Sequence, residues 1–123
     1  MDKLIKSLLV IATFAVQTSG MASAHARLTT SEPADGVVLN KSPQSVVLTF
    51  SEGLEPAFFQ LSIEDAQGAK VDLKDEKVGG QDGKCLSAAP TTPLSAGSYK
   101  IDWHVLSKDG HQTAGTVTFK VMP

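Results

Sequence analysis

Apolar and polar residues alternate over several short stretches of the chain. Residues 46–51 and 59–64 each place an apolar side chain at every second position, with mostly polar side chains between. Because successive side chains of a strand point to opposite faces, this alternation predicts strands with one buried face. Residues 71–73 and 84–88 indicate two shorter strands. Helical periodicity is weak after residue 25, and the only segment in which we expect a helical turn is residues 51–57.

The last third of the sequence predicts a long hairpin. Residues 99–106 alternate, a turn "SKDGHQ" follows, and residues 117–121 alternate again, so one face of the hairpin collects the side chains of Tyr99, Ile101, Trp103, Val105, Val117, Phe119 and Val121. The segment "PLSAGSY" has the form of a tyrosine corner, in which the hydroxyl group of Tyr99 bonds back to the preceding connection. Segments rich in Gly, Pro, Asn and Asp separate the predicted strands. The pattern therefore predicts an all-β fold, an immunoglobulin-like or cupredoxin-like Greek-key β-sandwich of about seven strands.

The start of the chain has a different pattern. Two lysines precede an apolar run from Leu8 to Val16, which is shorter than the ~20 residues needed to cross a bilayer. A polar break and the small residues "ASA" follow, as in a secretory signal that is cut between Ala24 and His25. We therefore expect residues 1–24 to be a signal peptide and residues 25–123 to be one exported domain. The alternative, a short amphipathic helix packed on the domain, does not suit a run that is apolar on all sides.

Composition narrows the class of protein. A chain of 123 residues with formal net charge −2 and scattered charges has no basic cluster for nucleic acid or an anionic bilayer surface. The predicted mature part, residues 25–123, is long enough to form one hydrophobic core. Cys85 is the only cysteine, so no internal disulfide can form, and we interpret it as a small buried strand residue rather than a reactive thiol.

The histidines are the candidate metal ligands. Of His25, His104 and His111, only His111 lies in a predicted turn beside a carboxylate, in the triplet "DGH". Gly110 lets the backbone bend so that Asp109 and His111 can share a cation. The alternative is a surface turn in which Asp109 accepts local backbone hydrogen bonds. His104 is expected to face solvent from its strand.

Signal cleavage would change the chemistry of His25. As the first residue it offers an imidazole and a free α-amine, which can close a chelate ring together. With Asp109 and His111 the donors become three nitrogens and one oxygen, a set that suits Cu(II) in a tetragonal plane. Since protons compete for these donors, affinity should fall on acidification.

Three segments carry a resemblance to a known family. "HARLTTSEPADG", "VVLTFSEGLEP" and "LSAGSYKIDWHVLSKDGHQTAGTVTFKV" together resemble the CopC family of periplasmic copper-resistance proteins over nearly the whole mature chain. The resemblance implies a small periplasmic β-sandwich that binds one Cu(II) ion through His25, Asp109 and His111. Glu52, in "TFSE", matches a family glutamate near that site and is expected to be an outer or optional ligand. Its alternative role is a solvated residue at a strand end.

The sequence also departs from the family. Some members carry a Met-rich segment that binds Cu(I), whereas residues 57–83 here contain neither Met nor His, and only Met122 remains in the mature chain. A thioether Cu(I) site is therefore not expected. His104 stands where many relatives have Arg. Phe58 breaks the alternation of its strand and is expected to be exposed as a contact for a partner.

The leading hypothesis is a non-enzymatic, monomeric periplasmic Cu(II) protein for sequestration, carriage or delivery in copper homeostasis and resistance. The resemblance suggests an inner-membrane protein of the CopD family as its partner. One alternative is a copper oxygenase of the histidine-brace type, which the inward assignment of Tyr99 and Trp103 disfavours because no aromatic surface is left for a polymer. The other is an exported immunoglobulin-like interaction module without metal.

Overall fold

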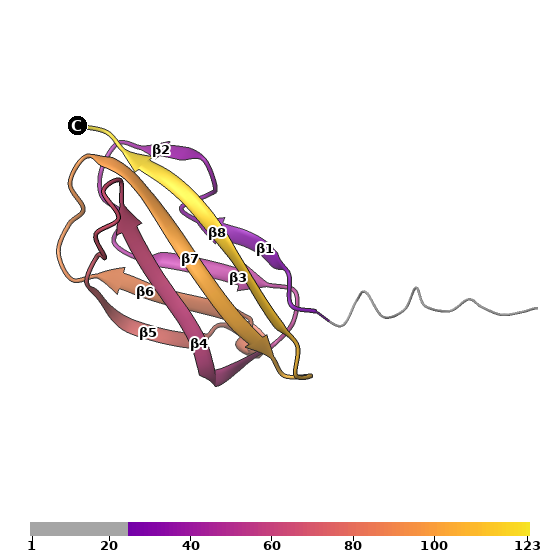
Figure 1. The fold of residues 1–123 in the computed structure, drawn as a ribbon. Helices are drawn as coiled ribbons and strands as arrows, with labels where there is room; N and C mark the ends of the chain where they lie inside the picture. Colours follow the sequence, from indigo (N-terminus) through magenta and orange to yellow (C-terminus); the bar gives the residue numbers. More distant parts are fainter. Residues whose placement is uncertain (1–24) are drawn as a thin grey trace, which may run out of the picture.

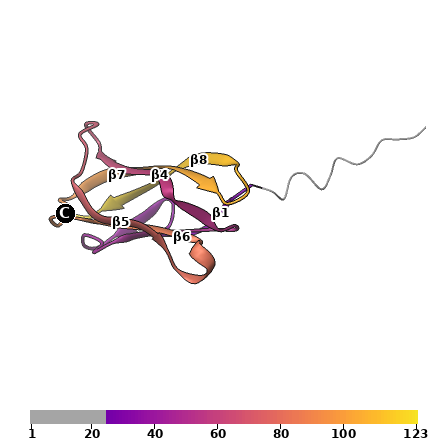
Figure 2. The ribbon, with the colours of Figure 1, turned by 90° about the horizontal axis from the view of Figure 1, so that it is seen from below.

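The computed structural model describes residues 25–123, which fold into a sandwich of two four-stranded sheets (Figure 1). One sheet has the strand order β1-β3-β6-β5 and the other β2-β8-β7-β4, and the two layers are visible in Figure 2. The strands are β1 (Leu28–Glu32), β2 (Val37–Leu39), β3 (Val46–Phe50), β4 (Leu54–Asp65), β5 (Leu73–Gly79), β6 (Cys85–Pro90), β7 (Gly97–Ser107) and β8 (Gln112–Val121). A single 3-10 turn, η3 (Gln81–Gly83), is the only helical element among the described residues. The predicted sandwich is confirmed, with eight strands rather than about seven.

Alternation along the strands places the core between the two sheets. In β3 every second residue from Val46 to Phe50 is buried, and in β7 the same holds from Tyr99 to Ser107. Trp103 is buried, as expected, and its ring meets that of Phe50 edge to face at a centroid distance of 5.0 Å. Such T-shaped aromatic pairs are favourable beyond the area that they bury.

Two connections close the sandwich. The hydroxyl group of Tyr99 donates to the carbonyl oxygen of Ser95 at 2.6 Å, which confirms the tyrosine corner. Strand β2 runs parallel to the end of β8, with Val37 opposite Phe119. This pairing brings the segment after β1 from one sheet across to the other.

The expected helical turn over residues 51–57 is wrong. Leu54 already pairs with Ser107 of β7, and the next paired residue of β4 is Phe59, opposite Val105. The four residues between them bulge away from β7, and Pro56 among them has no amide hydrogen to give a ladder. As predicted, Phe58 lies on this bulge with an exposed side chain.

The interpretation of Cys85 as buried is wrong. It is a strand residue of β6, but it is half-buried on the outer face of its sheet, since Leu86 and Ala88 take the inward positions. Its sulfur lies 3.5 Å from the Thr49 hydroxyl group. A Cβ atom on Gly80 would stand 2.6 Å from this sulfur, so the thiol is covered by backbone without entering the core.

The predicted signal, residues 1–24, lies outside the described residues. Within residues 25–123 there is no helix with the length and apolar character to cross a membrane.

Candidate metal centre

His25 and the turn between β7 and β8 meet at one end of the sandwich. The imidazole rings of His25 and His111 lie with their centroids 4.5 Å apart and their planes inclined by 32°. The two residues are 86 positions apart in sequence, so only the fold brings them together. Both side chains are accessible from solvent, because His25 is exposed and the side chain of His111 retains 45% of its accessible surface.

Contacts to both sheets fix the segment that carries His25. The side chain of Ala26 is buried, and its carbonyl oxygen accepts a hydrogen bond of 3.0 Å from the Thr113 hydroxyl group of β8. On the other side, the amide of Arg27 donates to Oγ of Ser51 at 2.9 Å, and the amide of Ser51 donates to the carbonyl oxygen of Arg27 at 2.8 Å. The two residues after His25 therefore hold its backbone in place.

The second segment is a tight hairpin turn. The amide of Ser107 donates to the carbonyl oxygen of His111, and the amide of Gly110 donates to the carbonyl oxygen of Ser107, both at 2.9 Å. Gly110 has φ of +94°, a conformation that side chains disfavour. Because glycine tolerates this conformation, the chain reverses between Asp109 and His111, and the two side chains lie next to each other.

Asp109 and His111 are in direct contact. Oδ1 of Asp109 lies 3.2 Å from Nδ1 of His111, and the same oxygen accepts a hydrogen bond from the Ser107 hydroxyl group. The Ser107 hydrogen bond, followed by the hydrogen bond and charge of His111, lowers the pKa of Asp109. The carboxylate is therefore ionised and able to stabilise a cation.

Glu52 lies in the connection from β3 to β4. Its two neighbours bond to the segments that carry the predicted ligands, residues 25–27 and residues 107–111. Ser51 bonds to the segment of His25, and the carbonyl oxygen of Gly53 accepts a hydrogen bond of 3.0 Å from the amide of Lys108 in the turn. The side chain of Glu52 is exposed and makes no hydrogen bond or ion pair within residues 25–123. Its backbone is thus held close to both segments, while its side chain has no contact within the described residues that would orient it.

The candidate residues form two contacts, one between His25 and His111 and one between His111 and Asp109. Within the described part of the chain, no three side chains of His, Cys, Asp or Glu converge so as to hold a metal ion. His111 touches both His25 and Asp109, and the remaining donor of the predicted set is the α-amine that cleavage would create. Two imidazoles at 4.5 Å, with a carboxylate at one of them, fit a small cation that takes nitrogen and oxygen donors.

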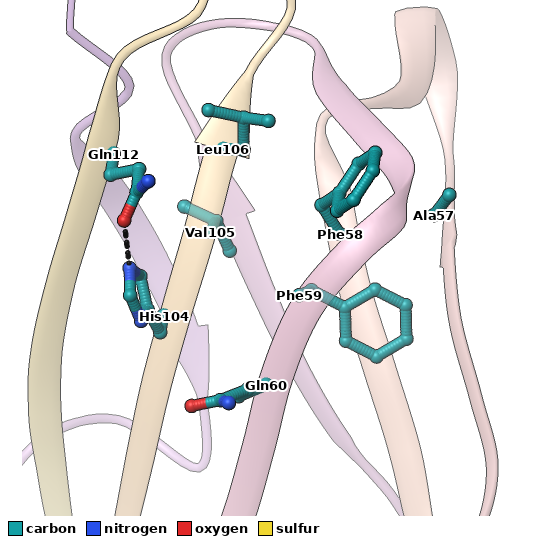
Figure 3. Close-up of a pocket in the computed structure, with 8 residues that line it drawn as sticks. All are labelled: Ala57, Phe58, Phe59, Gln60, His104, Val105, Leu106 and Gln112. Carbon is teal, nitrogen blue, oxygen red and sulfur yellow. Dashed lines mark hydrogen bonds between the residues drawn. The ribbon is translucent and has the colours of Figure 1, made fainter.

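His104 is not part of this group. It faces outward from β7, and Figure 3 shows its Nε2 joined to Oε1 of Gln112, at 2.9 Å. These residues line a shallow hollow beside the bulge of β4, next to Phe58 and Leu106. His104 is half-buried there and so is less solvated than its strand position suggested.

Three hydroxyl residues of the centre, Ser51, Ser107 and Thr113, were not predicted from the sequence. Each bonds to a ligand segment, and for Ser51 and Thr113 the partner is 24 and 87 positions away. Pattern alone cannot identify such partners. Ser107 carried the one usable signal, since alternation in β7 puts a polar side chain at an inward position.

Comparison with known proteins gives concordant matches. Residues 28–122 match the CopC domain, a range that includes Asp109 and His111 and begins three residues after His25. The chain is 39% identical to Protein YobA of Escherichia coli strain K12 over 98 residues, which are 80% of this chain and 79% of that protein. It is 36% identical to Copper resistance protein C of Pseudomonas syringae pv. tomato over 108 residues, 84% of this chain and 85% of that protein.

A solved structure agrees with the fold. PcoC, described as a methionine-rich copper resistance protein from Escherichia coli, superposes with a TM-score of 0.71 at 31% identity, covering 80% of this chain and 99% of that one. PcoC is described as methionine-rich, whereas residues 57–83 of this chain contain no methionine.

Proposed function

The chain belongs to the CopC family, and from this membership we propose that its mature form binds one Cu(II) ion for copper resistance and homeostasis. The proposed ligands are the α-amine and imidazole of His25, the imidazole of His111 and the carboxylate of Asp109. Glu52 serves as an outer or optional ligand at most, because no hydrogen bond or ion pair within residues 25–123 orients its side chain.

The contact between the two imidazoles is the observation that carries the proposal. Metal bonds to imidazole nitrogen are about 2 Å long, so rings 4.5 Å apart can bind one ion after small rotations. The backbone on either side of this contact is already fixed by Thr113, Ser51 and the turn hydrogen bonds. Binding therefore needs little ordering of the chain, which favours affinity.

The donor types favour Cu(II). Nitrogen and carboxylate oxygen ligands suit divalent copper, which stands at the top of the affinity order for such donors. Asp109 supplies an anionic donor at neutral pH, as an ordinary aspartate does, and the hydrogen bond from Ser107 lowers its pKa further. Cu(I) prefers thioether and thiolate ligands, and the mature chain offers only Met122, which follows the end of β8 opposite to the turn, and the half-buried Cys85 on the outer face of its sheet.

We propose a carrier or buffer rather than an enzyme. The protein would be exported to the periplasm with residues 1–24 as its signal, act as a monomer and deliver copper to a CopD-like inner-membrane protein. Tyr99 and Trp103 are both buried in the core, so the described residues present neither ring as a platform for a polymeric substrate.

The test compares three forms of the protein in a Cu(II) competition titration. The first begins at His25, the second carries one added glycine before His25, and the third carries the same glycine after Pro123 as the matched control. We expect the added N-terminal residue to weaken binding by at least about tenfold, or about 1.4 kcal/mol, because it turns the His25 amine into an amide, whose nitrogen binds copper only after losing its proton. The control should bind as the first form does.

Electron paramagnetic resonance of the same samples counts the nitrogen donors. A changed set of nitrogen donors in the N-terminally extended form alone agrees with the proposal. Equal affinity and equal spectra for all three forms contradict it.

A further inference from the structure

We propose that Ser107 is the positioning residue of this centre, and that its hydroxyl group holds Asp109 and His111 in the orientation in which they meet the ion. The inference rests on the proposed function, since it concerns how the same centre is built. It assigns a role to a residue that is not itself a ligand.

Ser107 is the only polar residue in the buried set of residues 25–123, with 1% of its surface exposed. It is the last residue of β7 and follows Val105 on the inward face, where every other position is apolar. Leaving a buried hydroxyl group without partners costs about 1–3 kcal/mol. A buried serine at this position is therefore stable only when its hydroxyl group makes hydrogen bonds.

The partners of the Ser107 hydroxyl group all belong to the two turn ligands. Its Oγ donates to Oδ1 of Asp109 and accepts from the amide of His111 at 3.2 Å. The carbonyl oxygen of His111, also 3.2 Å away, is a second acceptor for its single hydrogen. The charged acceptor forms the stronger bond, so the hydrogen goes to the carboxylate.

These contacts tie both ligands to one buried atom. The bond from Ser107 and the contact with His111 both fall on Oδ1 of Asp109, and Oδ2 has no hydrogen-bond partner within the described residues. The bond to the His111 amide fixes the backbone from which that imidazole extends. Because Ser107 is enclosed by the core, the two ligands take their orientation from the sandwich rather than from the exposed turn.

Removal of the hydroxyl group should release Asp109 from this orientation. Residues that orient metal ligands through hydrogen bonds typically change metal affinity by about 10- to 100-fold when they are replaced. We expect the same range for Ser107→Ala. The alanine is smaller and apolar, so it can be accommodated at the buried position.

The experiment uses mature protein beginning at His25, with Ser107→Ala and a control, Val105→Ala. Val105 is buried in the same strand, and its truncation lowers stability without touching the turn. Cu(II) affinity is measured by competition titration, and the coordination by electron paramagnetic resonance. In metal-free protein, NMR side-chain couplings report whether Asp109 keeps one rotamer.

We expect Ser107→Ala to bind Cu(II) about 10- to 100-fold more weakly, with an altered resonance spectrum and an Asp109 side chain that averages over rotamers. Val105→Ala should keep the wild-type affinity, spectrum and rotamer. Wild-type affinity and spectrum in Ser107→Ala overturn the inference, and so does an equal loss of affinity in Val105→Ala, which would indicate a general effect of stability.

Failure of the proposed function looks different. If wild-type protein binds no Cu(II), the copper proposal is wrong, while the rotamer measurement on metal-free protein still decides whether Ser107 orients Asp109.

Discussion

Replacing Thr113 by valine removes one hydrogen bond and leaves the shape of the side chain almost unchanged. The hydroxyl group of Thr113 donates to the carbonyl oxygen of Ala26, and this bond joins the segment of His25 to the opposite sheet. We expect Thr113→Val to loosen that segment and to weaken Cu(II) binding, because the His25 donors would have to be ordered when the ion binds.

The magnitude follows from the burial of Ala26. Ala26 is 1% exposed, so water has little access to its carbonyl oxygen once the hydroxyl group is gone. An unsatisfied buried acceptor costs about 1–3 kcal/mol, which corresponds to a fall in affinity of roughly 5- to 150-fold if the whole cost is returned as ordering on binding. Because the whole cost is not necessarily returned on binding, the 150-fold fall in affinity is an upper limit. The hydrogen bonds between Ser51 and Arg27 remain and keep the loss below it.

The assay is a Cu(II) competition titration on protein that begins at His25. Thr116→Val is the matched control, because Thr116 is on the same strand and its hydroxyl group bonds to an exposed carboxylate of Asp102 instead. Amide hydrogen exchange of metal-free protein adds a direct readout, since the Arg27 amide should exchange faster in Thr113→Val. If Thr113→Val and Thr116→Val bind Cu(II) equally well, the bond to Ala26 does not prepare the site and the reasoning is refuted.

Three further predictions concern the turn and the core. A Cβ atom on Gly115 would lie 2.5 Å from Cζ2 of Trp103, so Gly115→Ala should lower the free energy of unfolding by about 1–3 kcal/mol in a denaturant titration. The Ser107 hydrogen bond is the largest cause of the lowered pKa of Asp109, so NMR titration of metal-free protein should find this pKa higher in Ser107→Ala. In the wild type the resulting stabilisation is present above the unfolded-state pKa of about 3.9 and is lost as the pH falls through the lower folded-state value. Tyr99→Phe removes the corner hydrogen bond and should cost about 1 kcal/mol by thermal unfolding, with unchanged Cu(II) affinity.

Period-two alternation predicted the strands that face the core and missed those that do not. In strands β3 and β7 every second residue is buried, so the alternation in their sequence predicts both the strand and the face that packs on the core. Strand β1 has no fully buried residue, and β2 spans three residues that depend on the parallel pairing with β8. The first half of β4 is mostly exposed because it bulges away from β7, and residues 54–57 of it fall in the segment 51–57 for which a helical turn is expected.

The candidate ligands could be predicted from the sequence because few side chains bind divalent copper. Imidazole, carboxylate and amine are the groups that bind divalent copper, so His25, Asp109 and His111 could be named from residue type and position. Their assignment as ligands stays a prediction. The supporting hydroxyl groups could not be named, because serine and threonine occur throughout the chain and only the contacts made by Ser107 and Thr113 set them apart.

The burial of Ala26 also bears on when the proposed cut before His25 can be made. A peptidase that cuts before His25 needs the adjoining backbone extended and free, yet in the folded domain Ala26 is enclosed and Arg27 is paired with Ser51 on both its amide and its carbonyl group. We therefore expect processing to precede closure of this end of the sandwich. If the proposed cut is correct, a chain that folds first would protect the bond before His25, and the number of molecules with a free His25 amine would depend on the relative rates of cleavage and folding.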